Sequence, residues 1–273
     1  MSDGNDPKAA AAIAEERRRN EEAVERHTVV SEEEWLKQRL ALMEKEKQYM
    51  RMGDELAAEM RALPWLKVEQ SYTFTSPQGD LTFGDLFRGH SQLFLKHFMM
   101  EPNQEWQCPG CSLESDHVDG LLPHFEHHDM SYVAVSRAPI EEIEVVRKRM
   151  GWKFCWVSSY NSDFNYDFHV SFRPEEVAAG KTIYNFRERK IGPETFTLSG
   201  HSVFYRNAKG EIFRTYGTFG RGSEQFMGIY GYFDVLPKGR EEYGPHHSLP
   251  DWAKVHDQYE SSGDQGSCGC AHG

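Results

Sequence analysis

The part of this chain that most constrains its fold is the stretch 106–112, which reads WQCPGCS. A mostly apolar run over 93–100 precedes it and predicts a buried strand. Proline is favoured at the first position of a helix, because it has no N–H to leave unpaired there and its φ angle is already helical. A helix is therefore predicted to begin at Pro109. Cys108 would then lie at the helix N-terminus, where free N–H groups and the helix dipole stabilise a thiolate.

Composition and charge exclude several classes of protein. The chain has 273 residues, of which 38% are hydrophobic, so it can form a sizeable core. The net charge of −12 would repel a phosphate backbone, and we expect no nucleic-acid partner. No apolar run approaches the roughly 20 residues that span a bilayer, and the N-terminus has no apolar signal segment. The five cysteines are an odd number and do not follow the pattern of a secreted disulfide scaffold, so we expect a cytoplasmic protein without membrane association.

The composition changes along the chain, which divides it into four parts. The first part is charged and almost free of large apolar residues, and it is predicted to be a helical or disordered arm. A role of this arm in homo-oligomerisation stays open. The last part is rich in glycine and serine and is predicted to be flexible. The four parts are the charged arm over 1–27, a helical extension over 28–70, the main domain over 71–260 and the tail over 261–273.

The extension over 28–70 carries clear helix signals. Ser31 and Glu34 form a capping box, which starts a helix, and Pro64 ends it. Large apolar residues recur within it at helical spacing and give one apolar stripe. We expect this stripe to pack against the main domain. Its members are Trp35, Leu36, Leu40, Leu42, Met43, Tyr49, Leu56 and Met60.

The main domain is predicted to be an α/β domain. Its middle reads as a β-α-β-α-β succession, which favours right-handed crossovers and parallel pairing. A strand hairpin and a partly helical apolar segment follow. This order is the thioredoxin arrangement, a central mixed sheet flanked by helices, with the dithiol between the first core strand and the first core helix. The predicted strands are 71–76, 93–100, 131–136, 154–158, 201–206 and 211–216, and the predicted helices are 109–119, 139–150 and part of 226–233.

Separate stretches over residues 30–260 are distinctive when they are taken together. They include Glu33-Glu34-Trp35-Leu36, Arg61-Ala62-Leu63-Pro64-Trp65, His97-Phe98-Met99, Cys108-Pro109-Gly110-Cys111-Ser112, Val135-Ser136-Arg137-Ala138-Pro139, Lys148-Arg149-Met150-Gly151-Trp152 and Ser202-Val203-Phe204-Tyr205. With these the chain resembles an uncharacterised thioredoxin-like family of predicted dithiol–disulfide oxidoreductases, domain of unknown function 899. The resemblance implies the thioredoxin-like fold, and it implies a reaction only as far as the family's dithiol does.

The predicted reaction is thiol–disulfide exchange. The Cys108 thiolate would attack a disulfide, a peroxide or a sulfenic acid, giving a mixed disulfide or an oxidised cysteine. Cys111, one helical turn on, would resolve it to an intramolecular disulfide. We therefore expect an enzyme, an oxidoreductase with a redox-active CxxC motif. Its partners would be a protein or small-molecule disulfide or peroxide and an unidentified reductant, with no cofactor and no metal implied.

Four residues are expected to support the dithiol or to contact the substrate, namely Trp106, Pro109, Gly110 and His201. Thioredoxins place a cis-proline beside the dithiol, and the matching stretch here, 198–201, has no proline. This difference argues against a general thioredoxin-like reductase.

The residues around the dithiol lead to two further expectations. The acidic residues after Cys111 are expected to raise a thiol pKa and to oppose the helix dipole; they are Glu114, Asp116 and Asp119. The polar residues of the buried strand, Lys96 and His97, are interpreted as satisfied or snorkelling side chains, with proton transfer as the alternative.

The remaining cysteines leave alternatives open. Cys155 lies in an apolar strand and is interpreted as an inert core thiol. Cys268 and Cys270 lie in the tail, where they would relay electrons to the Cys108–Cys111 disulfide, complete a four-thiolate zinc site with it, or have no role. The alternative functions are therefore a non-enzymatic protein that binds zinc or another soft metal through those four cysteines, and a thioredoxin-fold binding scaffold.

Overall fold

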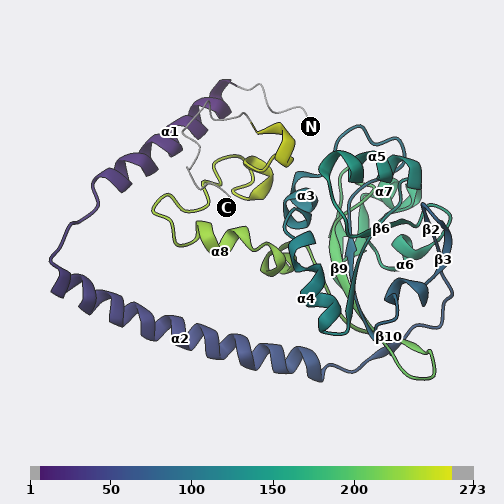
Figure 1. Cartoon of the computed structure of the whole chain (residues 1–273). Helices are drawn as coiled ribbons and strands as arrows, with labels where there is room; N and C mark the ends of the chain where they lie inside the picture. Colours follow the sequence, from purple (N-terminus) through teal and green to yellow (C-terminus); the bar gives the residue numbers. More distant parts are fainter. Residues whose placement is uncertain (1–6, 260–273) are drawn as a thin grey trace, which may run out of the picture.

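The computed structural model describes residues 7–259 (Figure 1). Its main feature is an eight-stranded mixed sheet with the strand order β1-β10-β9-β4-β5-β6-β2-β3. A two-stranded sheet, β7 with β8, lies outside it. The strands are β1 Leu66–Lys67, β2 Thr73–Ser76, β3 Gly79–Thr82, β4 Gln92–His97, β5 Met130–Ser136, β6 Cys155–Ser158, β7 Lys181–Tyr184, β8 Arg187–Lys190, β9 Gly200–Arg206 and β10 Ile212–Phe219.

Strand β4 lies at the centre of the topology. It pairs in parallel with β5, which in turn pairs in parallel with β6. On its other side β4 pairs antiparallel with β9, and β9 pairs antiparallel with β10. This succession of strands, with helices between β4, β5 and β6, is the thioredoxin-like arrangement that the sequence predicts.

The helices of the main domain lie on both faces of the sheet. Helices α3 and α5 contribute to one core, and α6 and α7 contribute to the other. Helix α5 ends at Gly151, whose φ of 72° needs the left-handed conformation that glycine adopts without strain. The helices are α1 Pro7–Glu25, α2 Glu32–Ala62, α3 Pro109–Ser115, α4 Leu122–His127, α5 Ile140–Met150, α6 Phe164–Asp167, α7 Pro174–Ala179 and α8 Ile229–Phe233, with short 3₁₀ turns η1 Asp85–Phe87, η2 Asp119–Leu121, η3 Gly220–Phe226, η4 Leu249–Asp251 and η5 His256–Gln258.

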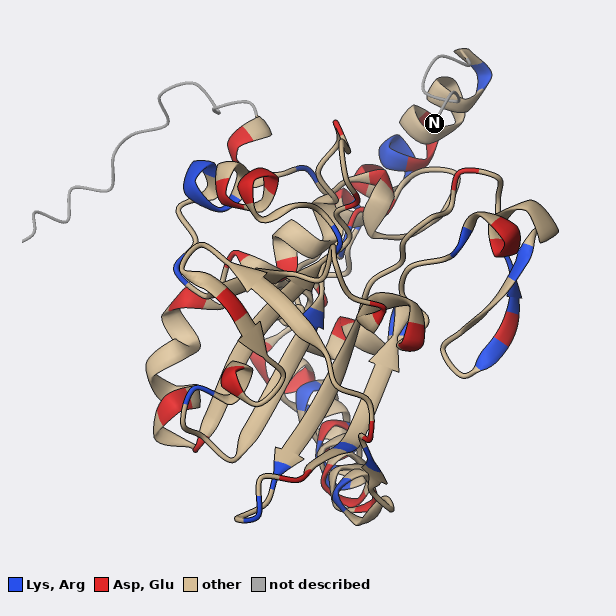
Figure 2. Cartoon of the chain, turned by 90° about the vertical axis from the view of Figure 1, so that its right-hand side faces the viewer, with Lys and Arg blue, Asp and Glu red and all other residues tan. Residues whose placement is uncertain are grey.

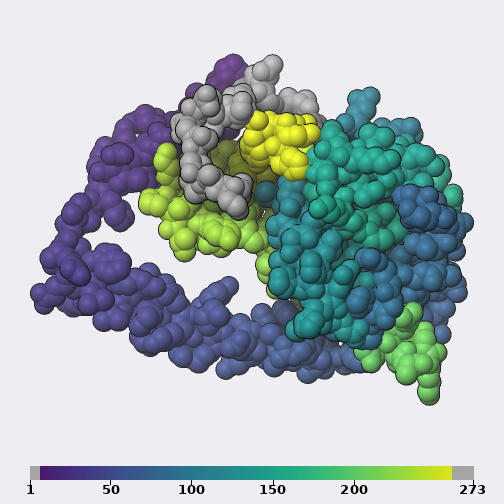
Figure 3. All heavy atoms as spheres, viewed as in Figure 1, coloured from purple at the N-terminus to yellow at the C-terminus, as the bar shows by residue number. Residues whose placement is uncertain are grey.

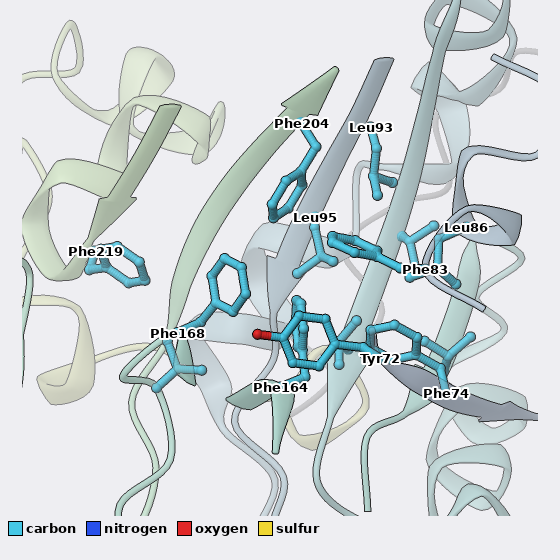
Figure 4. Packing of buried hydrophobic residues seen from close by; sticks show 14 of the residues in the cluster. Tyr72, Phe74, Phe83, Leu86, Leu93, Leu95, Phe164, Phe168, Phe204 and Phe219 are labelled. Carbon is cyan, nitrogen blue, oxygen red and sulfur yellow. The ribbon is translucent and has the colours of Figure 1, made fainter. Parts of the chain in front are cut away.

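The alternation along β4 directs its side chains into two separate cores. Leu93 and Leu95 point into an aromatic core, where Phe74, Phe83, Phe164 and Phe204 surround them (Figure 4). Phe94 points the other way, into the core that also contains Cys111, Tyr132, Trp152 and Trp156. Strands β4 and β5 carry only one Lys, Arg, Asp or Glu between them, which is Lys96. Most of the strand surface in Figure 2 is likewise free of charged residues. The charge of Lys96 is therefore unusual in its surroundings.

Helix α2 differs from the prediction. Its start is as expected, since the Ser31 hydroxyl accepts from the Glu34 N–H. None of its residues is buried, however, so the predicted packing of the apolar stripe on the main domain is wrong. The helix extends away from the sheet and leaves a gap beside it (Figure 1, Figure 3). The short strand β1 follows α2 and pairs with β10, so the sheet begins before residue 71. The division into four parts stays a prediction.

Among residues 7–259, no helix combines the length and the apolar character that a bilayer crossing needs. Helix α1 instead contacts the C-terminal part of the chain, where the Asn20 side-chain amide donates to the Lys238 carbonyl at 3.2 Å.

Candidate active site

The dithiol lies at the beginning of α3. Cys108 is the N-cap residue, with extended backbone angles, and Pro109 occupies the first turn. The Cys111 N–H donates to the Cys108 sulfur at 3.4 Å. Both cysteines are free thiols; Cys108 is half-buried and Cys111 is buried. The sequence predicted this placement at the helix N-terminus because proline and the preceding strand are local signals.

The two thiols have opposite acidities. The pKa of Cys108 is lowered to about 7, first by the hydrogen bond from the Cys111 side chain and further by backbone N–H groups and the charge of Lys96. Burial raises the pKa of Cys111 well above its ordinary value, and the neighbouring Cys108 adds to this effect. Cys108 is thus the thiol that ionises near neutral pH, while Cys111 keeps its proton.

A buried network of three ionisable side chains lies beneath the dithiol. Lys96 Nζ donates to Glu114 Oε2, and His201 Nε2 is hydrogen-bonded to Glu114 Oε1. Exposed fractions of 1%, 2% and 0% for Lys96, Glu114 and His201 show that water does not reach the network. The second ring nitrogen of His201, Nδ1, lies 3.1 Å from the Ser223 hydroxyl. Both oxygens of the Glu114 carboxylate are therefore hydrogen-bonded, one to Lys96 and the other to His201.

The register of the sheet creates this network. Lys96 in β4 and His201 in β9 are directly opposite each other across the antiparallel pair. Glu114 comes from α3, one turn after Cys111, and reaches between them. Although burial opposes its charge, Lys96 has a raised pKa because Glu114 and the two thiols attract the ammonium. Burial lowers the pKa of His201, which is therefore neutral at pH 7.

The expectation that the acidic residues after Cys111 raise a thiol pKa and oppose the helix dipole is wrong for Cys108, because each of them has other partners. Burial disfavours the charge of Glu114, yet its pKa is lowered because Lys96 and His201 stabilise the carboxylate. Asp116 accepts from the Trp152 indole N–H at 3.0 Å. Asp119 accepts from the backbone N–H groups of Lys153 and Phe154, which directly precede β6. None of the three carboxylates is directed at Cys108, and Lys96 places a positive charge near the thiol instead.

Lys96 and His97, the two polar residues of β4 that the sequence singles out, have different surroundings. Lys96 is fully buried and ion-paired, so the snorkelling interpretation is wrong for it, while the interpretation of a satisfied side chain holds. His97 points to the opposite face, where its Nε2 lies 2.9 Å from the Ser202 hydroxyl and its ring stacks on Phe164. Only Lys96 therefore faces the dithiol.

Trp106 and Gly110 lie next to the dithiol in the chain, and each has its own contacts. Trp106 is 39% exposed and lines a cavity of about 680 Å³ together with Met99, whose sulfur lies 3.8 Å from the Cys108 sulfur. The side chain of Gln104 donates to the Trp106 carbonyl at 2.7 Å and fixes this loop. A Cβ on Gly110 would lie 3.0 Å from a methyl group of Leu249 in the C-terminal segment, so a larger residue would press on that segment.

The other cysteines are separate from this site in what the structure describes. Cys155 begins β6, and burial raises its pKa, which fits an unreactive thiol. Cys268 and Cys270 lie outside the described residues. Within residues 7–259 no group of three or more His, Cys, Asp and Glu side chains is arranged to hold a metal ion.

Sequence reasoning missed the network and part of the cavity. The pairing of Lys96, Glu114 and His201 has a weak sequence signal, namely a lysine in an apolar strand and a glutamate one turn after the second cysteine. Arg137 and Glu101, which line the cavity, have no such signal, because their neighbours come from distant parts of the chain.

Comparisons with known proteins identify a family and several distantly similar structures. A family described as bacterial protein of unknown function (DUF899) matches residues 24–259. No curated protein matches the chain. Among solved structures, peroxidoxin BcpB from Mycobacterium tuberculosis is 14% identical over 54% of this chain and 80% of its own, with a TM-score of 0.36. A cysteine-to-serine mutant of PrxQ from Xylella fastidiosa is 18% identical over 59% and 89%, also with a TM-score of 0.36. A peroxiredoxin-like protein from Aquifex aeolicus is 11% identical over 57% and 78%, with a TM-score of 0.37. At these scores the likeness carries no argument about activity.

Proposed function

The chain belongs to the DUF899 family of bacterial proteins of unknown function, and we propose that it is a dithiol–disulfide oxidoreductase. Cys108 is the nucleophile and Cys111 is the resolving thiol. The observation that supports this best is the pair of thiols at the N-terminus of α3, one with a pKa of about 7 and the other buried and protonated. A thiolate at neutral pH next to a thiol one turn away is what exchange chemistry needs.

The reaction proceeds in two displacements. The Cys108 thiolate attacks one sulfur of a substrate disulfide, the S–S bond breaks, and the leaving thiolate takes a proton from water. Cys111 then loses its proton and attacks the Cys108 sulfur, which releases the second half of the substrate as a thiol. Two electrons pass from the dithiol to the substrate, and a separate reductant restores the dithiol. With a peroxide, the Cys108 thiolate attacks one oxygen, the O–O bond breaks, and the other oxygen leaves as an alcohol or water after taking up a proton. Cys108 becomes a sulfenic acid, and its condensation with the Cys111 thiol forms the disulfide and releases water.

The direct assay uses reduced protein and an excess of a model disulfide. Release of two substrate thiols per chain, together with a Cys108–Cys111 disulfide identified by peptide mass, is the expected result. The absence of thiol release under these conditions would rule out the proposed exchange. The substrate is a protein or small-molecule disulfide or a peroxide, and the cysteine usage of the chain supports a cytoplasmic location.

The rate of Cys108 alkylation is expected to follow a single titration with a midpoint near pH 7, because the reactive species is the thiolate. The rate falls below this pH as the thiolate takes up a proton and reaches a plateau above it. Iodoacetamide modification followed by peptide mass gives the profile. Cys111→Ala is the matched control: it removes the side-chain donor that lowers the pKa most, so the midpoint should move upward. A midpoint at the ordinary cysteine value of about 8.5 in the unmodified chain would contradict the proposed activation.

The tail cysteines have a separate test. The described chain ends close to the site, since His256 contacts Asp116 of α3 at 2.7 Å and Val255 packs in the same core as Cys111. If the pair relays electrons, replacing both Cys268 and Cys270 with serine slows turnover and leaves the rate of Cys108 alkylation unchanged. Loss of bound zinc would indicate the metal role, and no change would leave the pair without a role.

A further inference from the structure

The cavity beside the dithiol has the size and place of a binding site. Its volume of about 680 Å³ lies within the usual range of roughly 300–1,000 Å³ for ligand pockets. It is formed where the parallel strands β4 and β5 end, from the loop after β4, Arg137 after β5, α6 and the segment before β9. This carboxyl edge of parallel strands is where α/β sheets bind ligands. Met99 lies in the cavity wall, and its sulfur contacts the Cys108 sulfur.

Arg137 in the cavity wall has a buried hydrogen-bond donor without an acceptor in the described chain. Its side chain is only 17% exposed, yet its buried Nε donates no hydrogen bond to any other residue from 7 to 259. Glu101 Oε2 is 3.8 Å from its Nε, which is beyond hydrogen-bond distance. The guanidinium stacks on Tyr166, with 4.6 Å between its carbon and the ring centroid. Because buried donors are almost always paired, the guanidinium has donor capacity left for an oxygen acceptor from outside the described chain, which a ligand or water can supply.

The charged side chains around the cavity limit the class of ligand that can accept a hydrogen bond from Arg137. Glu101 Oε1 accepts from the Ser171 hydroxyl at 2.8 Å, while Oε2 has no hydrogen bond in the described chain. Glu194 also lines the cavity, so two carboxylates accompany one guanidinium. An anionic ligand would be repelled by this balance. A peptide group has a carbonyl acceptor and an N–H donor, and it matches Arg137 and Glu101 without adding charge.

The walls of the cavity favour apolar side chains. Trp106 and Phe196 are partly exposed there, at 39% and 42%, and Phe172 and Leu198 complete an apolar lining. Large aromatic surfaces of this kind are enriched where proteins recognise polypeptides.

We propose that this cavity binds the uncharged polypeptide segment next to the reactive cysteine of a protein disulfide. Arg137 donates to a peptide carbonyl of that segment, Glu101 accepts from a peptide N–H, and the aromatic wall takes an apolar side chain. The inference rests on the proposed function, since the bound segment presents its disulfide to Cys108, and it identifies protein disulfides as the substrate class.

The test compares two substrates of the same reaction. One is a peptide disulfide with neutral aromatic flanks, and the other is bis(2-hydroxyethyl) disulfide, which is too small to fill the cavity. Arg137→Met is expected to lower kcat/KM for the peptide at least tenfold through KM and to change kcat/KM for the small disulfide less than twofold. Arg137→Gln keeps amide donors and should recover part of the loss. Arg51→Met, at an exposed position of α2, is the matched control and should change neither.

Each other outcome overturns the inference in a recognisable way. An equal loss with both substrates would mean that Arg137 acts on the dithiol and not on the peptide, and the proposed function would stand. Oxidised glutathione, which is anionic, serves as a third substrate, and a loss confined to it would assign the cavity to a small acidic thiol. If the unmodified chain reduced neither disulfide, the proposed function itself would fail. Phe196→Ala, at a half-exposed position, provides a second test that does not disturb a buried charge.

Discussion

Replacing Cys108 with serine is expected to abolish disulfide exchange, by roughly 10³-fold or more, because a serine hydroxyl stays protonated and cannot displace a thiolate. Cys111→Ser is expected to have a different effect. It leaves the first displacement in place and stops the second, so the protein should retain one half of the substrate as a mixed disulfide on Cys108. Peptide mass after reaction with the model disulfide distinguishes the two variants.

The matched control is Cys155→Ser, whose thiol is half-buried and has a raised pKa. It should turn over at the rate of the unmodified chain. Turnover by Cys108→Ser, or a trapped adduct on Cys111 in place of Cys108, would contradict the assigned order of the two thiols.

Replacing Glu114 with alanine is expected to lower the free energy of unfolding by about 3–5 kcal/mol, because it leaves the buried Lys96 ammonium without its counter-charge. The paired change Lys96→Met/Glu114→Gln removes both charges, and the glutamine amide still reaches His201. We expect this double variant to lose much less stability than Glu114→Ala. Urea unfolding of both proteins measures the difference.

The double variant also has a consequence for the dithiol. Lys96 lowers the pKa of Cys108, so removing its charge should move the alkylation midpoint to higher pH. If the double variant were as unstable as Glu114→Ala, the ion pair would not be the source of the lost stability. If the alkylation midpoint of Cys108 in the double variant also stayed at the same pH, the network would have no influence on the nucleophile.

The order of elements in the main domain was predictable because its signals are local. Pro109 marks the start of α3, and Gly151 marks the end of α5. The alternation in β4 separates its two faces without knowledge of any partner strand. The hairpin of β9 with β10 follows from two apolar runs around a short polar loop. Such patterns depend on neighbours along the chain and are therefore visible in a single sequence.

The buried network was not predictable for a different physical reason. Lys96 and His201 meet only because the register of β4 on β9 places them opposite each other, and a shift of one residue would turn His201 to the other face. The same limit explains the wrong expectation for Glu114. Its negative charge would raise a thiol pKa only if Lys96 were not paired with it. An apolar stripe on a helix likewise does not specify which surface covers it. In α2, no residue is buried by any other part of the described chain.

The central claim is that Cys108 and Cys111 form a reversible redox couple. It is tested most directly by equilibrating the full chain in thiol–disulfide buffers of stepped potential, and by measuring the Cys108–Cys111 disulfide by peptide mass and bound metal by elemental analysis. The proposed function predicts one disulfide that forms and is reduced reversibly, with a midpoint above about −300 mV, and no stoichiometric metal. Stoichiometric zinc with four protected thiols that a chelator releases would contradict it in favour of metal binding, and the absence of both a disulfide and a metal would leave only a binding scaffold.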